Sequence, residues 1–198
     1  DAGDTLVLSA SFEDGSALPA WLSFDAQTGA FSGTPTNDDV GMVTVTITAT
    51  DGGNLSALNT FGLTVVNVND APTVANLIAD QAAIEDALFS FQTPVDTFAD
   101  VDAGDVLAYS ALLADGNALP GWLSFDAATR TFSGTPSFDD IGTVGVTVTA
   151  TDGGDLNAAD MFALTVRIAP DQVVVGTDGD AALKTSSGND VIDAGGGN

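Results

Sequence analysis

The sequence has no cysteine and no histidine, and three Lys and Arg residues stand against 28 Asp and Glu. The missing cysteines exclude disulfides and thiolate metal sites. The missing histidines exclude zinc sites of the usual kind and His-based catalysis. Because phosphate binding needs basic patches, nucleic acid is not an expected partner. No apolar run is long enough to span a bilayer, so we expect no membrane insertion.

The acidity that remains is almost entirely aspartate, because Glu13 and Glu85 are the only glutamates behind a formal net charge of −25. Aspartate is short, suits turns and is a hard oxygen ligand. Self-repulsion is barely compensated within the chain, so bound cations are the simplest missing partner. Disorder is the alternative reading of such acidity, but a hydrophobic content of 44% supplies enough apolar material for a core.

A long internal repeat organises the chain, with an offset of 101 residues. The matching motifs are LPAWLSFD at 18–25 with LPGWLSFD at 119–126, FSGTP at 31–35 and 132–136, and TATDGG at 48–53 and 149–154. A repeat of this length is a duplicated domain and not a solenoid unit. We therefore expect a first domain at 1–68, a second, complete domain at 69–170, and a linker with a short tail at 171–198.

Each copy has the pattern of β-structure. Apolar residues alternate with threonine over Val43–Thr50 and again over Val144–Thr151, which is the period of a strand with two different faces. Gly, Asp and Pro clusters interrupt such runs at short intervals, as in a sandwich of many short strands. The predicted fold class is all-β, with two tandem Ig-like antiparallel β-sandwiches.

The two copies are unequal at their beginnings. The second copy has about 24 residues before Asp102 that the first copy lacks, and they include expected strands near 73–78 and 88–93. Because an unpaired strand edge invites pairing, we expect strand exchange or a ragged, mobile first copy. A closed seven-strand first copy within residues 1–70 would contradict this expectation.

Oxygen-bearing side chains cluster at the junction between the copies. Asn67, Asn69 and Asp70 alternate along the linker, and Asp100, Asp102 and Asp105 follow at short spacing, with Gly104 permitting a tight turn. Such spacing lets several carboxylates converge on one cation. Calcium is favoured over magnesium, because it accepts more protein oxygens in looser geometry.

These residues resemble a known family. VNVNDAPTV is similar to the interdomain linker of cadherins, DVDAGD to their Asp-x-Asp calcium loop, and TATDGG to their late-strand Asp motif. Together with LPxWLSFD and FSGTP, the match over residues 1 to about 168 is closest to bacterial cadherin-like domains of the dystroglycan type, also called "putative Ig" domains. The resemblance makes the two expected sandwiches cadherin-like.

The resemblance implies a calcium site shared by both copies and the linker. Its implied ligands are Asp38, Asp39, Asn67, Asn69, Asp70, Asp100, Asp102, Asp105 and Asp152. Asn37-Asp38-Asp39 stands where cadherins have Asp-Arg-Glu, and Ala71 replaces an Asn, so fewer or weaker sites are expected than at a cadherin junction. The alternative is turn chemistry without an ion, which we prefer for Asp14, Asp25, Asp115 and Asp126.

Two further sites are implied more weakly. Glu85 resembles the early cadherin glutamate that faces the next junction, where Asp140 and Asp171 could join it. Asp1, Asp4 and Asp51 match the downstream half of a junction whose other half is absent from the sequence, so that site is expected to be empty or incomplete.

The tail has its own period, because Gly179, Gly188 and Gly197 recur every nine residues. GNDVID at 188–193 resembles the calcium-binding nonapeptide of RTX (hemolysin-type) repeats. This resemblance implies export by type I secretion from a Gram-negative bacterium. The alternative is a flexible Gly/Asp linker.

We therefore expect a secreted or surface-located, calcium-binding structural or adhesion module of a large bacterial protein, in which Ca²⁺ rigidifies the interdomain junction. It is not expected to be an enzyme, because few groups could tune an acid or stabilise an oxyanion. Protein partners, homophilic or through strand exchange, remain open. The alternative function is calcium-dependent polysaccharide binding through Trp21 and Trp122, although both are expected to pack in the core.

Overall fold

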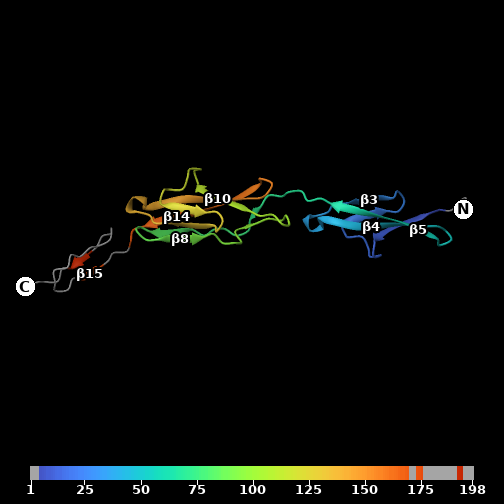
Figure 1. The fold of residues 1–198 in the computed structure, drawn as a ribbon, viewed down its shortest axis with the longest axis horizontal. Helices are drawn as coiled ribbons and strands as arrows, with labels where there is room; N and C mark the ends of the chain where they lie inside the picture. Colours follow the sequence, from blue (N-terminus) through green and yellow to red (C-terminus); the bar gives the residue numbers. More distant parts are fainter. Residues whose placement is uncertain (1–4, 170–172, 176–190, 194–198) are drawn as a thin grey trace, which may run out of the picture. The chain divides into compact units, whose positions relative to one another are not determined.

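A computed structural model describes residues 5–169, 173–175 and 191–193, and these residues are nearly all β (Figure 1). Their only helices are two 3₁₀ turns, η1 (Asn37–Asp39) and η2 (Phe138–Asp140). Over the same ranges, no helix has the length and apolar character needed to cross a membrane. The chain divides between Asn69 and Asp70 into two compact units, unit 1 and unit 2. The predicted all-β class is confirmed.

Unit 2 is a sandwich of two main sheets. The four-stranded sheet has the order β10 (Ala108–Leu113), β13 (Gly142–Thr151), β14 (Asn157–Arg167) and β7 (Gln81–Ile84), with β7 parallel to β14 and the other pairs antiparallel. The three-stranded antiparallel sheet has the order β11 (Leu123–Asp126), β12 (Thr131–Gly134) and β8 (Phe89–Gln92). A third, two-stranded sheet pairs β6 (Thr73–Val74) antiparallel with β9 (Phe98–Ala99).

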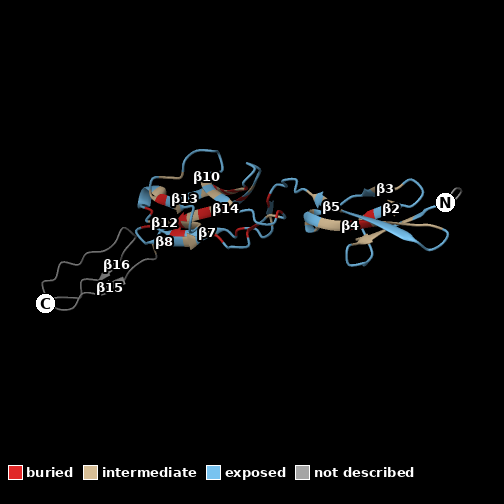
Figure 2. Cartoon of the chain, turned by 45° about the vertical axis from the view of Figure 1, so that its right-hand side comes forward, coloured by how far each residue is buried: buried red, intermediate tan, exposed pale blue. Residues whose placement is uncertain are grey.

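The core of unit 2 lies between the two main sheets (Figure 2). Alternate residues of β14 face inward, so that Phe162, Leu164 and Val166 are at most 4% exposed. Phe132 of β12 is fully buried, with its ring centroid 4.6 Å from Phe125 and 5.6 Å from Phe162. The sequence period therefore identified the strand faces that form this core.

Unit 1 repeats the same plan with fewer strands. One sheet has the order β1 (Val7–Phe12), β4 (Gly41–Thr50) and β5 (Ser56–Val65), and the other pairs β2 (Leu22–Asp25) with β3 (Ala30–Gly33). The register is preserved, because Phe24 pairs with Phe31 as Phe125 pairs with Phe132. Among the described residues of unit 1, no strand corresponds to β7 or β8, so the unit is not a closed seven-strand sandwich. Strand exchange stays a prediction.

The glycine of the FSGTP motif has a steric role in both units. At Gly134 a side-chain Cβ would collide with the backbone carbonyl of Trp122, and at Gly33 it would collide with that of Trp21. Only glycine lets the two backbone segments approach so closely. In each unit the Trp backbone therefore packs directly against the glycine.

The tail contributes two short strands to the described residues. β15 (Val173–Val175) pairs in parallel with β16 (Val191–Asp193), so each residue pairs with one that lies two nine-residue periods further along the chain. The repeating glycines of the predicted RTX pattern lie outside the described residues.

Candidate metal centre

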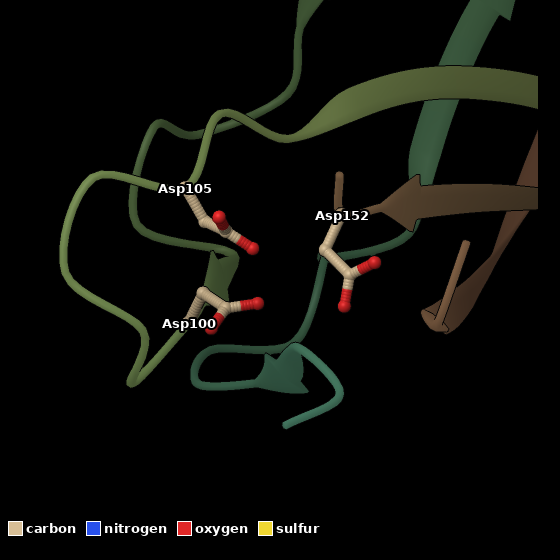
Figure 3. A group of neighbouring side chains, drawn as sticks. All are labelled: Asp100, Asp105 and Asp152. Carbon is tan, nitrogen blue, oxygen red and sulfur yellow. The ribbon is translucent and has the colours of Figure 1, made fainter. Parts of the chain in front are cut away.

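Three carboxylates converge at one end of unit 2 (Figure 3). Asp100 and Asp105 belong to the loop between β9 and β10, and Asp152 follows β13 directly. One oxygen of each can be chosen so that all three lie within 4.8 Å of one another. In Figure 3 the carboxylates of Asp100 and Asp105 point toward Asp152, which lies about fifty residues further along the sequence.

The loop that carries two of these carboxylates is held by its own hydrogen bonds. The amide of Asp102 donates to Oδ1 of Asp100 at 2.9 Å, and the amide of Asp105 donates to the carbonyl of Asp102 at 3.3 Å. Gly104 has φ +97°, a conformation that favours glycine. The turn therefore folds Asp100 and Asp105 back toward each other, as the Asp-x-Asp-x-Gly-Asp spacing predicted.

Asp152 is positioned by the turn that it caps. Its Oδ1 accepts hydrogen bonds from the amides of Gly154 and Leu156, both at 2.8 Å, and the residue is 6% exposed. These bonds restrain the side-chain rotamer of Asp152. A carboxylate held in this way keeps one position, as a preorganised metal ligand would need to.

Asp102 is buried and accepts a hydrogen bond from the start of unit 2. It is 5% exposed, and its Oδ2 accepts a hydrogen bond from the amide of Asp70 at 2.7 Å. The start of unit 2 is thereby tied to the loop that carries Asp100 and Asp105. The sequence predicted Asp102 as a ligand but gave no sign of this bond.

The centre is electrostatically unbalanced. Oδ2 of Asp100 is buried and has no hydrogen-bond partner, and an uncompensated buried charge is costly. Three like charges within a few ångströms add repulsion. The described part of the chain has two basic residues, Arg130 and Arg167. Arg130 places its guanidinium over the ring of Tyr109, 5.5 Å from the centroid. A cation among the three carboxylates would relieve both costs.

The nine predicted ligands fall into three groups. Asp100, Asp105 and Asp152 are brought together, and Asp70 and Asp102 are joined to them through the loop. The four others, which belong to unit 1, are Asp38, Asp39, Asn67 and Asn69. Their participation in the same site stays a prediction.

Asp39 and Asp140 occupy equivalent positions in the two 3₁₀ turns. Oδ2 of Asp39 accepts hydrogen bonds from the amide and hydroxyl of Thr36, which hold the pKa of Asp39 below its ordinary value. Ser137 supplies the same two donors to Asp140, with the same lowering of its pKa. Each aspartate therefore has one oxygen committed to its turn.

The aspartates predicted to have only a turn role do cap turns. Each carboxylate accepts a hydrogen bond from a nearby backbone amide, and at some positions also from a side chain. These hydrogen bonds lower the pKa of each carboxyl group. The residues are Asp14, Asp25, Asp115 and Asp126. The turn role predicted for these four residues is therefore present, and the absence of an ion at them stays a prediction.

The two weaker sites stay predictions. Glu85 is 1% exposed, its Oε1 accepts the amide of Ala169 at 3.1 Å, and its Oε2 has no hydrogen-bond partner. Asp171 lies outside the described residues, as do Asp1 and Asp4. Asp51 caps its turn through the amides of Gly53 and Leu55, as Asp152 does in unit 2.

The repeated sandwich and its acidic loops place the chain among tandem Ig-like β-domains. The sequence profile of the family described as "Putative Ig domain" matches residues 1–66 and 71–167. The chain belongs to this family, as the resemblance in its motifs implied.

Curated relatives include the "Serine-rich adhesin for platelets" of Staphylococcus aureus, 36% identical over 135 residues that make up 68% of this chain and 5% of the adhesin. Its counterpart in strain MRSA252 is 35% identical over the same share of this chain and 9% of its own length. The chain thus spans less than a tenth of these relatives.

Solved structures with the same fold include two cadherin fragments. Human mucin-like protocadherin EC1-2 has a TM-score of 0.55 at 16% identity, covering 85% of this chain and 86% of its own. Mouse cadherin-23 EC22-24 has a TM-score of 0.56 at 20% identity, covering 82% and 53%. At these identities the likeness establishes the fold, which is that of tandem cadherin-like sandwiches.

Proposed function

We propose that this chain is a non-catalytic, calcium-binding structural module of an extracellular adhesive protein, in which Ca²⁺ rigidifies the junction between units 1 and 2. The observation that carries the proposal is the convergence of Asp100, Asp105 and Asp152, which come from separate segments of unit 2. Carboxylate oxygens are the donors that Ca²⁺ prefers.

The chemistry of the donor set fits calcium. The buried, unpartnered Oδ2 of Asp100 needs a positive partner, and the chain's three Lys and Arg cannot balance its 28 acids. Bound Ca²⁺ would offset two of the three negative charges that these carboxylates carry. Asp38, Asp39, Asn67, Asn69 and Asp70 would complete its coordination from unit 1 and the linker, which is how an ion could fix the junction.

The bond between Asp70 and Asp102 couples the site to the linker. Because Asp102 lies in the same loop as Asp100 and Asp105, ordering of that loop by an ion would also order the first residue of unit 2. Without such a restraint, motion between domains is the default. Calcium at about 100 times its dissociation constant would add roughly 2.7 kcal/mol to the stability of the bound form.

An extracellular, adhesive setting is supported by the relatives. Two are named as platelet adhesins, and another structural neighbour is described as extracellular cadherin domains of protocadherin gamma B2, with a TM-score of 0.57 at 19% identity. The parallel pair β15 and β16, two nonapeptides apart, supports an RTX-type coil in the tail. An RTX-type coil would imply that the protein is exported by type I secretion from a Gram-negative cell.

Polysaccharide binding is a weaker candidate. Trp122 is partly buried and packs against the core of unit 2, with its ring centroid 6.3 Å from that of Phe89. Trp21 lines an open cavity in unit 1 whose other walls are mostly apolar, with Ser32 and Thr64 as the polar side chains.

The proposal is tested by thermal unfolding in EDTA, in millimolar Ca²⁺ and in millimolar Mg²⁺, together with calorimetric titration of Ca²⁺. We expect a calcium-specific rise in Tm that is lost in Asp100→Asn combined with Asp105→Asn. Asp115→Asn combined with Asp126→Asn removes the same charge from exposed turns and should keep the response. Distance distributions between spin labels on the two units should narrow with Ca²⁺. Equal Tm values in EDTA and Ca²⁺ would overturn the proposal.

A further inference from the structure

Equivalent apolar residues have different burial in the two units. Phe132, Phe162, Leu164 and Val166 of unit 2 are between 0% and 4% exposed. Their counterparts in unit 1 are only half-buried; they are Phe31, Phe61, Leu63 and Val65. Because side chains and strand register are the same, the difference comes from what covers them (Figure 2).

In unit 2 the cover is the segment Gln81–Gln92, which forms β7 and β8. β7 pairs in parallel with β14 over Leu164–Arg167, and β8 pairs antiparallel with β12 over Thr131–Gly134. One polypeptide segment therefore adds a strand to each of the two sheets and closes both along the same side of the sandwich.

Two aromatic side chains of β8 fill the space between the sheets. The ring of Phe89 lies edge-on to Trp122 at 6.3 Å, and Phe91 lies 6.4 Å from Phe132 and 5.7 Å from Phe162. Burial of an aromatic side chain is among the largest single contributions to packing. The Phe-x-Phe pattern is thus the main apolar feature of the segment.

Unit 1 presents the matching space as an open groove. A cavity of about 350 Å³ is lined by Trp21, Phe31, Gly33, Leu63 and Val65, among others. These residues are the counterparts of those that surround β8 and the end of β7 in unit 2. On either side of the groove, β5 and β3 are edge strands, which offer backbone groups for pairing.

From this correspondence we infer that the unit 1 groove is a docking site for a polypeptide segment with the pattern of Gln81–Gln92. The segment adds one strand to β5 and one to β3 and inserts two aromatic side chains between the sheets, a form of β-strand addition. The inference concerns unit 1 alone and does not depend on calcium at the carboxylates of unit 2.

The occupant is a segment additional to this chain's own. The described residues contain two such sites and one segment of this pattern, Gln81–Gln92, and that segment fills unit 2. A second copy that donated its own Gln81–Gln92 would leave its unit 2 open, with no net gain in strand pairing or burial. The occupant is therefore a β7–β8-like segment from another domain of this family, in the same protein or in another.

The test uses the whole chain with a synthetic peptide of residues 80–94. In the Trp122→Phe variant Trp21 is the only tryptophan, and we expect a saturable blue shift of its emission with one peptide bound per chain. The matched Trp21→Phe variant, which reports from the filled unit 2, should not respond. A peptide with Phe89→Ser and Phe91→Ser should bind at least about 100-fold more weakly, since each buried aromatic is worth more than one tenfold step.

Hydrogen exchange on the wild-type chain gives a measurement that needs no variant. Peptide binding should protect the unpaired backbone amides of Leu63–Val66, at the end of β5, and of Ala30–Gly33 in β3. These residues are the counterparts of those that β7 and β8 pair with in unit 2. As a second arm, residues 77–101 placed ahead of Asp1, at the spacing they hold before Asp102, should raise the Tm of unit 1 and abolish peptide binding.

Several outcomes would overturn the inference. One is the absence of any response to about 1 mM peptide together with an unchanged Tm in the extended chain. Another is equal binding of the Ser-substituted peptide. A chain dimer that disappears on Phe89→Ser with Phe91→Ser would assign the groove to a second copy. A polysaccharide that displaces the bound peptide would assign the groove to a sugar.

Discussion

Asp70 and Asp102 lie 32 residues apart in the sequence, and a 2.7 Å hydrogen bond from the amide of Asp70 to Oδ2 of Asp102 joins them. The acceptor is a carboxylate that is 5% exposed. This bond closes the loop that contains β6 and β9 at the start of unit 2. Part of the acidic junction is therefore structural, whatever it binds.

The first prediction separates that structural role from metal binding. Asp102→Ala leaves the amide of Asp70 without its acceptor, so the free energy of unfolding of unit 2 should fall by about 1–3 kcal/mol in EDTA. Asp102→Asn keeps an oxygen acceptor and should lose less. Urea unfolding followed by the fluorescence of Trp122 measures both. If Asp102→Ala is as stable as wild type in EDTA, the bond contributes nothing.

The second prediction compares two proposed ligands, of which Asp152 is held by hydrogen bonds and Asp105 is exposed. Asp105 is exposed, so Asp105→Asn should change the unfolding free energy in EDTA by less than about 0.5 kcal/mol while weakening calcium binding. Asp152→Ala should also destabilise unit 2 in EDTA, because the amides of Gly154 and Leu156 lose their acceptor. Calorimetry with Ca²⁺ and urea unfolding in EDTA measure the two effects separately.

Asp51→Ala is the matched control for Asp152→Ala. It removes the same turn bonds from unit 1, at Gly53 and Leu55, and should destabilise unit 1 without changing the calcium affinity of unit 2. A loss of calcium affinity in Asp51→Ala equal to that in Asp152→Ala would show that the substitutions act through general charge and not through a site.

The third prediction concerns pH. Hydrogen bonds from the hydroxyl and amide of Ser137 hold the pKa of Asp140 below its ordinary value of 3.8. Because the folded pKa is the lower one, the stabilisation is fully present above pH 3.8 and is lost as the pH falls through the folded pKa. The stability difference between wild type and Asp140→Asn should therefore be constant near neutral pH and shrink below pH 3.8.

Acid also relieves the repulsion of a chain with net charge −25, so a control of equal charge is needed. Asp139→Asn removes one charge beside Asp140 and leaves the Ser137 bonds in place. Urea unfolding of the three proteins in EDTA between pH 7 and pH 2.5 should show the acid-dependent difference for Asp140→Asn alone. The same slope for both variants would assign the effect to net charge.

Much of the fold follows from local pattern in the sequence. The alternation over Val144–Thr151 lies within β13, and the repeated motifs take the same register in both units because their packing is local. The strand expected near 73–78 is shorter, at Thr73–Val74. The strand Gln81–Ile84 was not anticipated, because QAAI is weakly apolar and its burial depends on pairing with β14.

The candidate site was predictable in part for the same reason. Asp100 and Asp105 are close in sequence, so turn geometry alone brings them together, whereas Asp152 reaches them only through the packing of β13. The family resemblance supplied that long-range contact. The bond between Asp70 and Asp102 had no sequence signal, since any residue with an amide could stand at the donor position.

The fourth prediction compares one core position in its two settings. Phe132 is fully buried, so Phe132→Ala should lower the unfolding free energy of unit 2 by about 3–5 kcal/mol. Phe31, its counterpart, is half-buried beside Phe24 and Phe61, and Phe31→Ala should cost unit 1 less than about 2 kcal/mol. Separate fitting of the Trp21 and Trp122 transitions measures the two losses in one protein.

The same pair also reports on the unit 1 groove. Once a β7–β8-like segment covers Phe31, that side chain gains the burial that Phe91 gives to Phe132 in unit 2. The cost of Phe31→Ala should then rise toward that of Phe132→Ala in the chain extended by residues 77–101, while the cost of Phe132→Ala stays constant. Equal costs for the two substitutions in the unextended chain would mean that the core of unit 1 is already closed.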